Sequence, residues 1–185
     1  MASPFDSQYD SIRNRIIAYA DQYGIDRNIA IWQIWQESRF NPRVCSGANA
    51  CGIAQFIPDT AARFGVDRND IESSLNGWGR YMSQMLGMFN GRIDIALAGY
   101  NSGENRNEYK AAARENRDIN WSVMPAGVQS ETQNYVKTIM RNAGASPAIG
   151  GSINVNTSPA SLLGGTNNTV LIGLALLLFV VLVTD

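Results

Sequence analysis

The chain has 185 residues, 45% of them hydrophobic, which is enough to bury the core of one domain of ordinary size but not of two. Its 15 Lys and Arg nearly balance its 16 Asp and Glu, and without a basic cluster this composition argues against nucleic acid as a partner. There is no histidine, which excludes Ser-His-Asp and Cys-His catalysis and removes the commonest nitrogen ligand of zinc. Carboxylate chemistry remains, and we expect neither a metal nor a cofactor.

Hydrophobic periodicity predicts a helical domain. From residue 9 to residue 23, apolar and aromatic side chains recur at steps of three and four, as on an amphipathic helix that ends at Gly24. A second helix is expected after Asp26, and residues 41–55 are expected to form a loop because they are rich in Pro, Gly and Asn. Further helical patterns cover residues 58–65, 70–89, 92–101, 105–117 and 130–143. No segment alternates like a strand, so the sequence predicts an all-α domain over residues 1–142.

One carboxylate has an unusual position. In "IWQIWQESRFNP", residues 31–42, an apolar stretch with two tryptophans runs directly into Glu37. A charged side chain is rarely left buried without a partner, so Glu37 needs either a partner or a function. Considered alone, it would be a partly exposed carboxylate at a helix end.

Four stretches occur in a characteristic order: "QESRFNP", "SGANACGIAQFIPDTA", "ALAGYNSGE" and "ETQNYV". Together they resemble the lytic transglycosylase family with a goose-lysozyme-like α domain, and the resemblance covers about residues 10–142. Members of that family cut the MurNAc-GlcNAc backbone of peptidoglycan. The resemblance therefore implies a lysozyme-like helical fold and peptidoglycan glycan strands as the substrate.

The resemblance also implies which residues form the site. Glu37 corresponds to the catalytic glutamate, and the residues expected to bind the sugar are Ser46, Gln55, Tyr100, Asn101 and Tyr135. Glu131 belongs to the last motif, where a structural charge at a helix N-terminus and a role in the site are both open. The sequence departs from the family pattern at two positions, Ala54 and Gly99, which puts the sugar subsite preference in doubt.

The chemistry of a single carboxylate agrees with this interpretation. Apolar surroundings can raise the pKa of Glu37 so that it holds a proton for the leaving oxygen. Ordinary glycosidases need a second carboxylate about 5 to 9.5 Å away, and between Glu37 and Asp59 the sequence has none. In the family, the same glutamate then acts as a base on the MurNAc 6-hydroxyl, which closes onto C1 as a 1,6-anhydro sugar.

Two other functions stay open. A lysozyme-type hydrolase would combine Glu37 with a carboxylate from elsewhere, such as Asp59, Asp94 or Glu131. A catalytically idle peptidoglycan-binding or virion structural protein would need no turnover at all. The product of the reaction distinguishes the hydrolase from a transglycosylase. A turnover assay distinguishes the idle protein from both enzymes.

The sequence allows two states for the cysteines. Cys45 and Cys51 bracket Ser46 in the loop, and either a disulfide or two reduced thiols would fit.

The four tryptophans are expected to fill the core rather than to form sugar platforms, because helical tryptophans usually lie in interiors. They are Trp32, Trp35, Trp78 and Trp121.

The C-terminal region reads as a membrane anchor. Residues 169–184 are uncharged and almost wholly aliphatic, and at about 1.5 Å per helical residue they reach roughly 24 Å, a borderline span. Residues 143–168 are rich in Gly, Ser, Asn and Pro, and they read as a flexible linker. The N-terminus shows no secretory signal peptide. This combination resembles virion-associated transglycosylases of internal-membrane phages, which implies the virion membrane as the location; a bacterial envelope membrane, in type IV secretion or pilus assembly, is the alternative.

Overall fold

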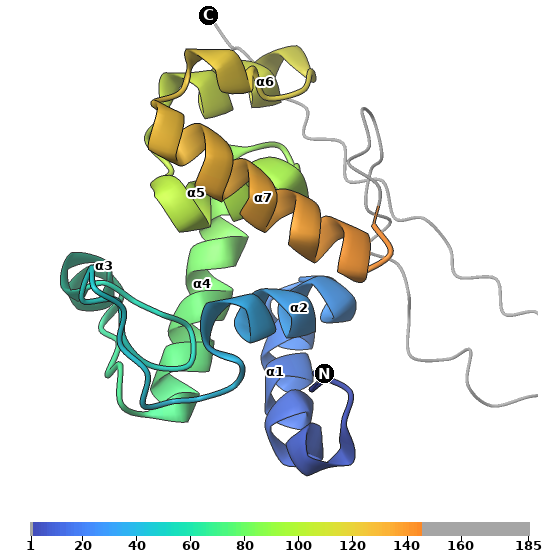
Figure 1. The fold of residues 1–185 in the computed structure, drawn as a ribbon, viewed down its shortest axis with the longest axis vertical. Helices are drawn as coiled ribbons and strands as arrows, with labels where there is room; N and C mark the ends of the chain where they lie inside the picture. Colours follow the sequence, from blue (N-terminus) through green and yellow to red (C-terminus); the bar gives the residue numbers. More distant parts are fainter. Residues whose placement is uncertain (1, 146–185) are drawn as a thin grey trace, which may run out of the picture. The chain divides into compact units, whose positions relative to one another are not determined.

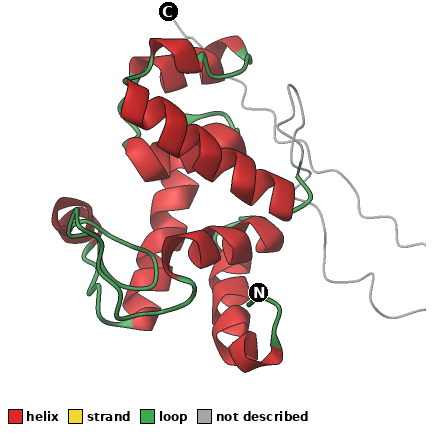
Figure 2. Ribbon diagram, viewed as in Figure 1, coloured by secondary structure: helices red, strands yellow, loops and turns green. Residues whose placement is uncertain are grey.

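The structure, a computed structural model, describes residues 2–145, and within them all regular structure is helical (Figure 2). The only strand-like pairings in this part of the chain are isolated bridges from Cys51 to Cys45 and to Phe56. The elements in chain order are η1 (Ser7–Tyr9), α1 (Asp10–Gln22), α2 (Arg27–Ser38), α3 (Pro58–Phe64), α4 (Ile71–Met88), α5 (Ile93–Ser102), α6 (Asn107–Glu115), η2 (Trp121–Val123) and α7 (Ala126–Asn142). The predicted all-α domain is confirmed.

Local chemistry explains where several helices begin and end. The carboxylate of Asp26 accepts hydrogen bonds from the backbone N–H groups of Asn28 and Ile29, which caps α2. Asp70 caps α4 in the same way. Helix α3 begins with Pro58 and ends at Gly65, which is left-handed with φ of 60°.

The last helix begins earlier than the sequence pattern indicates. Helix α7 starts at Ala126, directly after Pro125, whereas the hydrophobic pattern places its start at Ser130. Proline suits this boundary because its missing N–H would have no partner in the first turn of a helix. The Ser130 hydroxyl donates to the carbonyl of Ala126, so Ser130 lies inside the helix.

Helices distant in the sequence pack together around α4 and α5. Helix α4 contacts α1, α3 and α5, and α5 also contacts α6 and α7. Figure 1 shows α7 running across the domain from α5 to α2, and α2 and α7 are in contact. Every residue of α5 from Ile93 to Gly99 is buried, which is the environment expected for a helix that is apolar on nearly all sides. This packing brings the C-terminal part of α2 next to α7.

The predicted membrane anchor lies outside the residues that the structure describes. Within residues 2–145 no helix combines the length and the apolar character that crossing a bilayer requires. The predicted anchor, residues 169–184, and residues 146–168 of the predicted linker are outside the described residues.

Candidate active site

A cleft with a volume of about 570 Å³ opens beside the end of α2. Its wall takes residues from α2, from the loop that follows, from α3 and α4, from the end of α5 and from α7. The cleft thus brings together segments that lie far apart in the sequence, from Glu37 to Glu131. It contains Glu37 together with four of the predicted sugar-binding residues, Ser46, Gln55, Tyr100 and Asn101.

Glu37 lies in the last turn of α2, and the chain turns away directly after it. Helix α2 ends at Ser38, and the next two residues, Arg39 and Phe40, both have positive φ, 53° and 62°. Left-handed backbone is unfavourable for residues with side chains, so the surrounding packing must enforce this turn. Phe40 is buried and packs edge-on against Trp35, which anchors the turn in the core.

Burial makes Glu37 a weak acid. Only part of its side chain is open to the cleft, and the resulting loss of hydration raises the pKa of its carboxyl group to about 7. A hydrogen bond from Tyr135 acts in the opposite direction and lowers the pKa. A carboxyl group with this pKa is protonated in about half of the molecules at neutral pH, so it can act as an acid or as a base.

Tyr135 supports Glu37 from behind rather than lining the cleft. Its hydroxyl donates to Oε1 of Glu37 at 2.5 Å, and its side chain is 7% exposed. Burial and the neighbouring carboxylate raise the pKa of Tyr135 well above its ordinary value, so the phenol keeps its proton and remains a donor.

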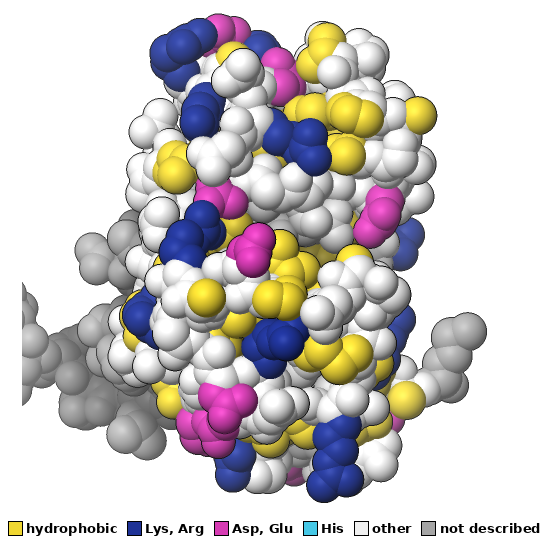
Figure 3. Space-filling view, turned by 90° about the vertical axis from the view of Figure 1, so that its left-hand side faces the viewer, with side chains coloured by type: hydrophobic (Ala, Val, Ile, Leu, Met, Phe, Trp, Pro, Cys, Tyr) yellow, Lys and Arg dark blue, Asp and Glu magenta, His cyan; other side chains and the backbone are white. Residues whose placement is uncertain are grey.

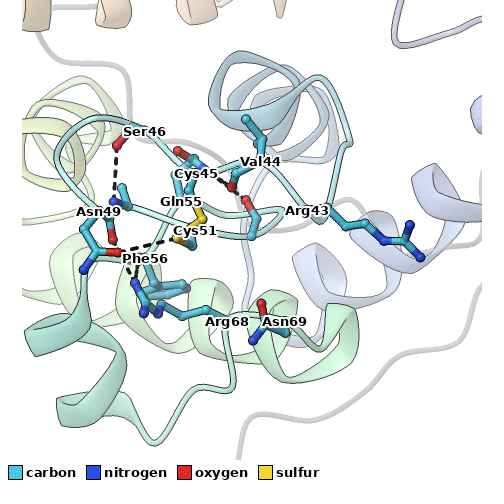
Figure 4. The surroundings of a disulfide bond; sticks show 12 residues. Arg43, Val44, Cys45, Ser46, Asn49, Cys51, Gln55, Phe56, Arg68 and Asn69 are labelled. Carbon is cyan, nitrogen blue, oxygen red and sulfur yellow. Dashed lines mark hydrogen bonds between the residues drawn. A yellow bond between two sulfur atoms is a disulfide. The ribbon is translucent and has the colours of Figure 1, made fainter.

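A disulfide closes the loop after α2. The two sulfur atoms of Cys45 and Cys51 are bonded, and their Cα atoms lie 4.2 Å apart (Figure 4). Ser46 lies inside this ring, and its Oγ accepts a hydrogen bond from the backbone N–H of Ala50. Gly52 follows with φ of 83°, and a Cβ there would lie 2.0 Å from the carbonyl oxygen of Arg68, so only glycine fits.

Gln55 holds the same loop together. Its amide nitrogen donates to the carbonyl oxygens of Val44 and Gly52, both at 2.9 Å. Gln55 itself is left-handed with φ of 51°. Because both amide hydrogens are used by the loop, Gln55 presents its side-chain oxygen as the group available to a ligand in the cleft.

Tyr100 and Asn101 extend from the end of α5. The Tyr100 hydroxyl donates to the carbonyl oxygen of Ala54 at 2.7 Å, which ties α5 to the loop. Burial and the nearby Glu37 raise the pKa of Tyr100 well above its ordinary value. Oδ1 of Asn101 accepts a hydrogen bond from Thr132 of α7 at 2.6 Å, which leaves its NH₂ group for another acceptor.

A second carboxylate, Glu104, lies in the cleft wall, and the sequence analysis assigned it no role. It is 6% exposed, and its two oxygens accept hydrogen bonds from Tyr81 at 2.6 Å and from Arg63 at 2.7 Å. Burial pushes the pKa of Glu104 up, but the hydrogen bonds from Tyr81, from the Glu104 backbone N–H and from Arg63 outweigh it and hold the pKa below its ordinary value. Glu104 is therefore ionised, and each of its two oxygens already accepts a hydrogen bond. It could not be found from the sequence because its partners are 23 and 41 residues away.

The other three carboxylates that could assist Glu37 lie in different environments. Glu131 lines the cleft and is exposed, whereas Asp59 is exposed outside the cleft wall. Asp94 is buried in a two-point ion pair with Arg92 and does not line the cleft. Among residues 2–145, no group of three or more acidic or cysteine side chains is placed to hold a metal ion.

Charges on the surface near α3 are mixed. On the face shown in Figure 3, acidic and basic side chains are scattered among polar and apolar ones, and neither sign forms a continuous patch.

Comparison with known protein families identifies the domain. The family described as "Transglycosylase SLT domain" matches residues 14–122, which is more than half of the chain. The chain belongs to this family. The SLT match includes the end of α2, the disulfide loop and the end of α5, and thus most of the cleft wall.

Relatives of this SLT domain occur in bacteria and in phages. The chain is 32% identical over 111 residues to "Membrane-bound lytic murein transglycosylase D" of Escherichia coli K12, which covers 56% of this chain and 25% of that protein. It is 26% identical over 136 residues to the "Transglycosylase" of Enterobacteria phage PRD1, covering 72% of this chain and 46% of that protein. The chain therefore spans between a quarter and a half of the length of these relatives.

Solved structures support the fold of the SLT domain. The crystal structure of the 70 kDa soluble lytic transglycosylase Slt70 from Escherichia coli superposes with a TM-score of 0.55 at 22% identity. The superposition covers 74% of this chain and 25% of Slt70. The predicted lysozyme-like helical domain agrees with this similarity.

The two positions that depart from the family pattern, Ala54 and Gly99, both lie outside the cleft wall. Ala54 is fully buried and outside the cleft wall, and it contributes its carbonyl to Tyr100. A Cβ at Gly99 would lie 3.2 Å from Met85 and from Phe89, so Gly99 allows close packing of α5 on α4. Neither change alters a side chain that lines the cleft of this SLT domain.

The tryptophans of the SLT domain belong to its core. Trp78 and Trp35 are buried, Trp32 and Trp121 pack against the core from its edge, and none of the four lines the cleft. The roles of the predicted sugar-binding residues stay predictions, although the structure brings all of them to the cleft or, for Tyr135, directly behind Glu37.

Proposed function

We propose that this chain is a peptidoglycan lytic transglycosylase, which cleaves the β-1,4 bond between MurNAc and GlcNAc and forms 1,6-anhydro-MurNAc. The observation that carries the proposal is Glu37, a carboxyl group with a pKa of about 7 in the wall of a cleft. Membership of the SLT family and relatives named lytic murein transglycosylase support it.

The reaction needs one residue that changes roles. Protonated Glu37 gives its proton to the O4 of GlcNAc as the bond from that oxygen to C1 of MurNAc breaks. The resulting Glu37 carboxylate, which Tyr135 stabilises by its hydrogen bond, then takes the proton of the 6-hydroxyl while O6 bonds to C1. The proton lost in the first step is regained in the second, so the enzyme returns to its starting state without water.

The sugar would be held by groups already fixed by the fold. Ser46, the side-chain oxygen of Gln55 and the NH₂ group of Asn101 provide polar atoms at different sides of the cleft. Tyr100 uses its hydroxyl hydrogen to bond the carbonyl of Ala54, so its ring and, as an acceptor only, its hydroxyl oxygen are available to a sugar. Preorganised contacts of this kind lower the barrier because little side-chain ordering remains for the bound state.

The arrangement of carboxylates disfavours most forms of the hydrolase alternative. Asp59 and Asp94 do not line the cleft, and Glu104 is bonded through both oxygens to Tyr81 and Arg63. Glu131 is different, because it lines the cleft and is exposed. A lysozyme-type hydrolase with Glu131 activating water is therefore the second candidate function.

Product analysis separates the two candidates. Purified peptidoglycan is digested with the full chain, and the muropeptides are reduced with borohydride and weighed. A transglycosylase yields 1,6-anhydro ends that take up no hydride, whereas a hydrolase yields new reducing ends that do and adds the mass of one water. Reducing ends as the main product would overturn the proposal in favour of the hydrolase, and no cleavage at all would favour the idle binding protein.

We further propose that residues 169–184 anchor the chain in the virion membrane of a phage and that residues 143–168 form a flexible linker. The uncharged aliphatic composition supports the anchor. The similarity to the PRD1 transglycosylase and to "Peptidoglycan transglycosylase gp16" of Escherichia phage T7 supports a role in local opening of the cell wall by a phage. A bacterial membrane is the alternative location, supported by the relatives named membrane-bound.

A further inference from the structure

Arg63 of α3 is the basic residue of the cleft wall. Among residues 2–145, the charged side chains that line the cleft are Glu37, Arg63, Glu104 and Glu131, so Arg63 is the one cation in this set. The side chain of Arg63 is 45% exposed, whereas that of its ion-pair partner Glu104 is 8% exposed. Because Arg63 lines the cleft and is half exposed, part of its side chain remains open to a ligand.

Three neighbours hold the Arg63 guanidinium in place. Its Nη1 donates to Oε1 of Glu104 at 2.7 Å, and the guanidinium carbon lies 5.0 Å from the ring centre of Phe64 and 5.2 Å from that of Tyr81. The Tyr81 hydroxyl donates to the other oxygen of Glu104 at 2.6 Å, so the four side chains form one connected group. Arg63 is therefore ordered before a ligand arrives, which lowers the entropy cost of binding.

The same guanidinium has unused hydrogen-bond donors. All nitrogen atoms of an arginine side chain donate, in one plane. The ion pair with Glu104 uses Nη1, and within residues 2–145 the Nε and Nη2 groups of Arg63 have no acceptor. A planar pair of donors matches the two oxygens of a carboxylate, and hydrogen bonds between charged groups are about twice as strong as neutral ones.

The substrate of the proposed function has its carboxylates on one kind of sugar. The N-acetylated rings of the glycan strand are uncharged, whereas the lactyl group of MurNAc carries a carboxyl group that is either free or joined to a peptide stem with carboxylates of its own. We propose that Arg63 binds such a carboxylate, of the lactyl group or of the peptide stem, while Glu37 acts on the glycosidic bond. The inference rests on the proposed function and adds the group of the substrate that Arg63 selects.

The acidic residues of the cleft wall are compatible with an anionic group beside Arg63. The charge of Glu104 is already compensated by Arg63 and by the hydrogen bond from Tyr81. Glu131 is exposed, so water and salt screen its charge. Glu37 is neutral when it is ready to act as the acid. Directed donors at short range, rather than the net charge of the wall, therefore determine which group binds next to Arg63.

The test compares the binding of matched ligands by calorimetry. The protein is the full chain with Glu37→Gln in detergent, so that no ligand is cut. The first ligand is the soluble disaccharide GlcNAc-MurNAc with its peptide stem, and the second is the same compound with its carboxyl groups converted to methylamides. We expect the acid form to bind about tenfold more tightly than the methylamide form, because only the acid form offers Arg63 a charged acceptor.

Variants at Arg63 should remove this difference. Arg63→Gln should weaken binding of the acid form about tenfold and leave the methylamide form within about twofold. Arg63→Lys keeps a positive charge beside buried Glu104 but lacks the planar donors, so it should also lose most of the preference even if Arg63→Gln folds poorly. Arg80→Gln is the matched control, because Arg80 also ties α4 to α3, by donating to the Phe64 carbonyl, but lies outside the cleft wall.

The outcomes separate the inference from the proposed function. Equal weakening of both ligand forms at Arg63 would show that it binds sugar hydroxyls or only maintains the fold, and unchanged binding would show no role; either result overturns the inference alone. If no ligand binds the Glu37→Gln chain, the proposed function is rejected and the inference with it. The disaccharide without its peptide identifies the source, because sensitivity to Arg63→Gln persists for a lactyl carboxylate and disappears for a carboxylate of the stem.

Discussion

The Tyr135 hydroxyl donates a hydrogen bond to Oε1 of Glu37, although the two residues are 98 positions apart in the chain. Helix α7 crosses the domain so that Tyr135 reaches the last turn of α2. This bond and the burial of Glu37 have opposite effects on the carboxyl pKa, and burial dominates. The balance between them determines at which pH Glu37 can act as an acid.

Glu37→Gln should keep the fold and abolish turnover. The amide resembles the carboxyl group in shape but cannot give or take the proton, and loss of a positioned acid or base typically costs about 10² to 10⁴ in rate. The measurement is the rate of peptidoglycan cleavage, with circular dichroism to check folding. Glu72→Gln, a change at an exposed glutamate of α4 outside the cleft, is the matched control and should retain activity. Activity of Glu37→Gln close to wild type would mean that another residue is the acid.

Tyr135→Phe should move the pH dependence of the reaction. The hydrogen bond from Tyr135 lowers the pKa of Glu37, so its loss raises this pKa above about 7. Because the acid must be protonated, the alkaline limb of the profile of kcat/KM against pH should shift upward by about one unit. Tyr19→Phe is the control, since Tyr19 also donates to a glutamate, Glu72, but on the surface of α1. A profile that stays in place would show that the bond has no influence on the acid.

Glu37 should also make stability depend on pH. Its pKa is about 7 in the folded chain and about 4.5 in the unfolded chain, so the folded state binds the proton more tightly. The contribution of Glu37 to the free energy of unfolding is complete below pH 4.5. It is lost as the pH rises through 7, by up to about 3 kcal/mol. Urea unfolding of wild type and of Glu37→Gln at several pH values tests this. The variant should gain stability relative to wild type as the pH rises from 4.5 to 8, and a constant difference would contradict the shifted pKa.

Loss of the disulfide should weaken both the loop and the site. The bridge closes a small ring from Cys45 to Cys51, and the double variant Cys45→Ser with Cys51→Ser should lower the free energy of unfolding by about 2 kcal/mol. Turnover should fall as well, because Ser46 and Ala50 of this ring line the cleft. Chemical unfolding and cleavage assays measure the two effects. Two freely titrating thiols in the folded protein would show that the bridge does not form.

Removal of the C-terminal region should release the chain from membranes. A chain that ends at Asn142, the last residue of α7, keeps all helices of the domain, and it should stay in the soluble fraction. The full chain should instead sediment with lipid vesicles or require detergent, because residues 169–184 are uncharged and aliphatic. Equal solubility of the two chains without lipid or detergent would contradict the anchor.

The sequence alone determined the helical architecture and pointed to Glu37 as the expected acid. Periodic apolar residues predict helices because burial of one helix face depends on positions three and four apart, which are local in the chain. The start of α7 was misplaced because the turn after Pro125 contains Gly127, a poor helix former, and only one side chain packed on the core, Val128, so hydrophobic periodicity gives little signal there. Glu37 could be singled out from the sequence because its motif, "QESRFNP", is one contiguous stretch, residues 36–42.

Only the tertiary structure decided which distant groups meet Glu37. Tyr135 appears in the sequence as a member of a motif, but its bond to Glu37 depends on the crossing of α7 over α2. The binding of Glu104 by Arg63 and Tyr81 depends in the same way on the packing of α3 and α4 beside the end of α5. The pKa of a carboxyl group is set by its burial and by the donors around it, and both follow from contacts between residues far apart in the chain. The sequence could therefore propose Glu37 as the acid, whereas the pKa of Glu37 and the hydrogen bonds that hold Glu104 followed from the fold.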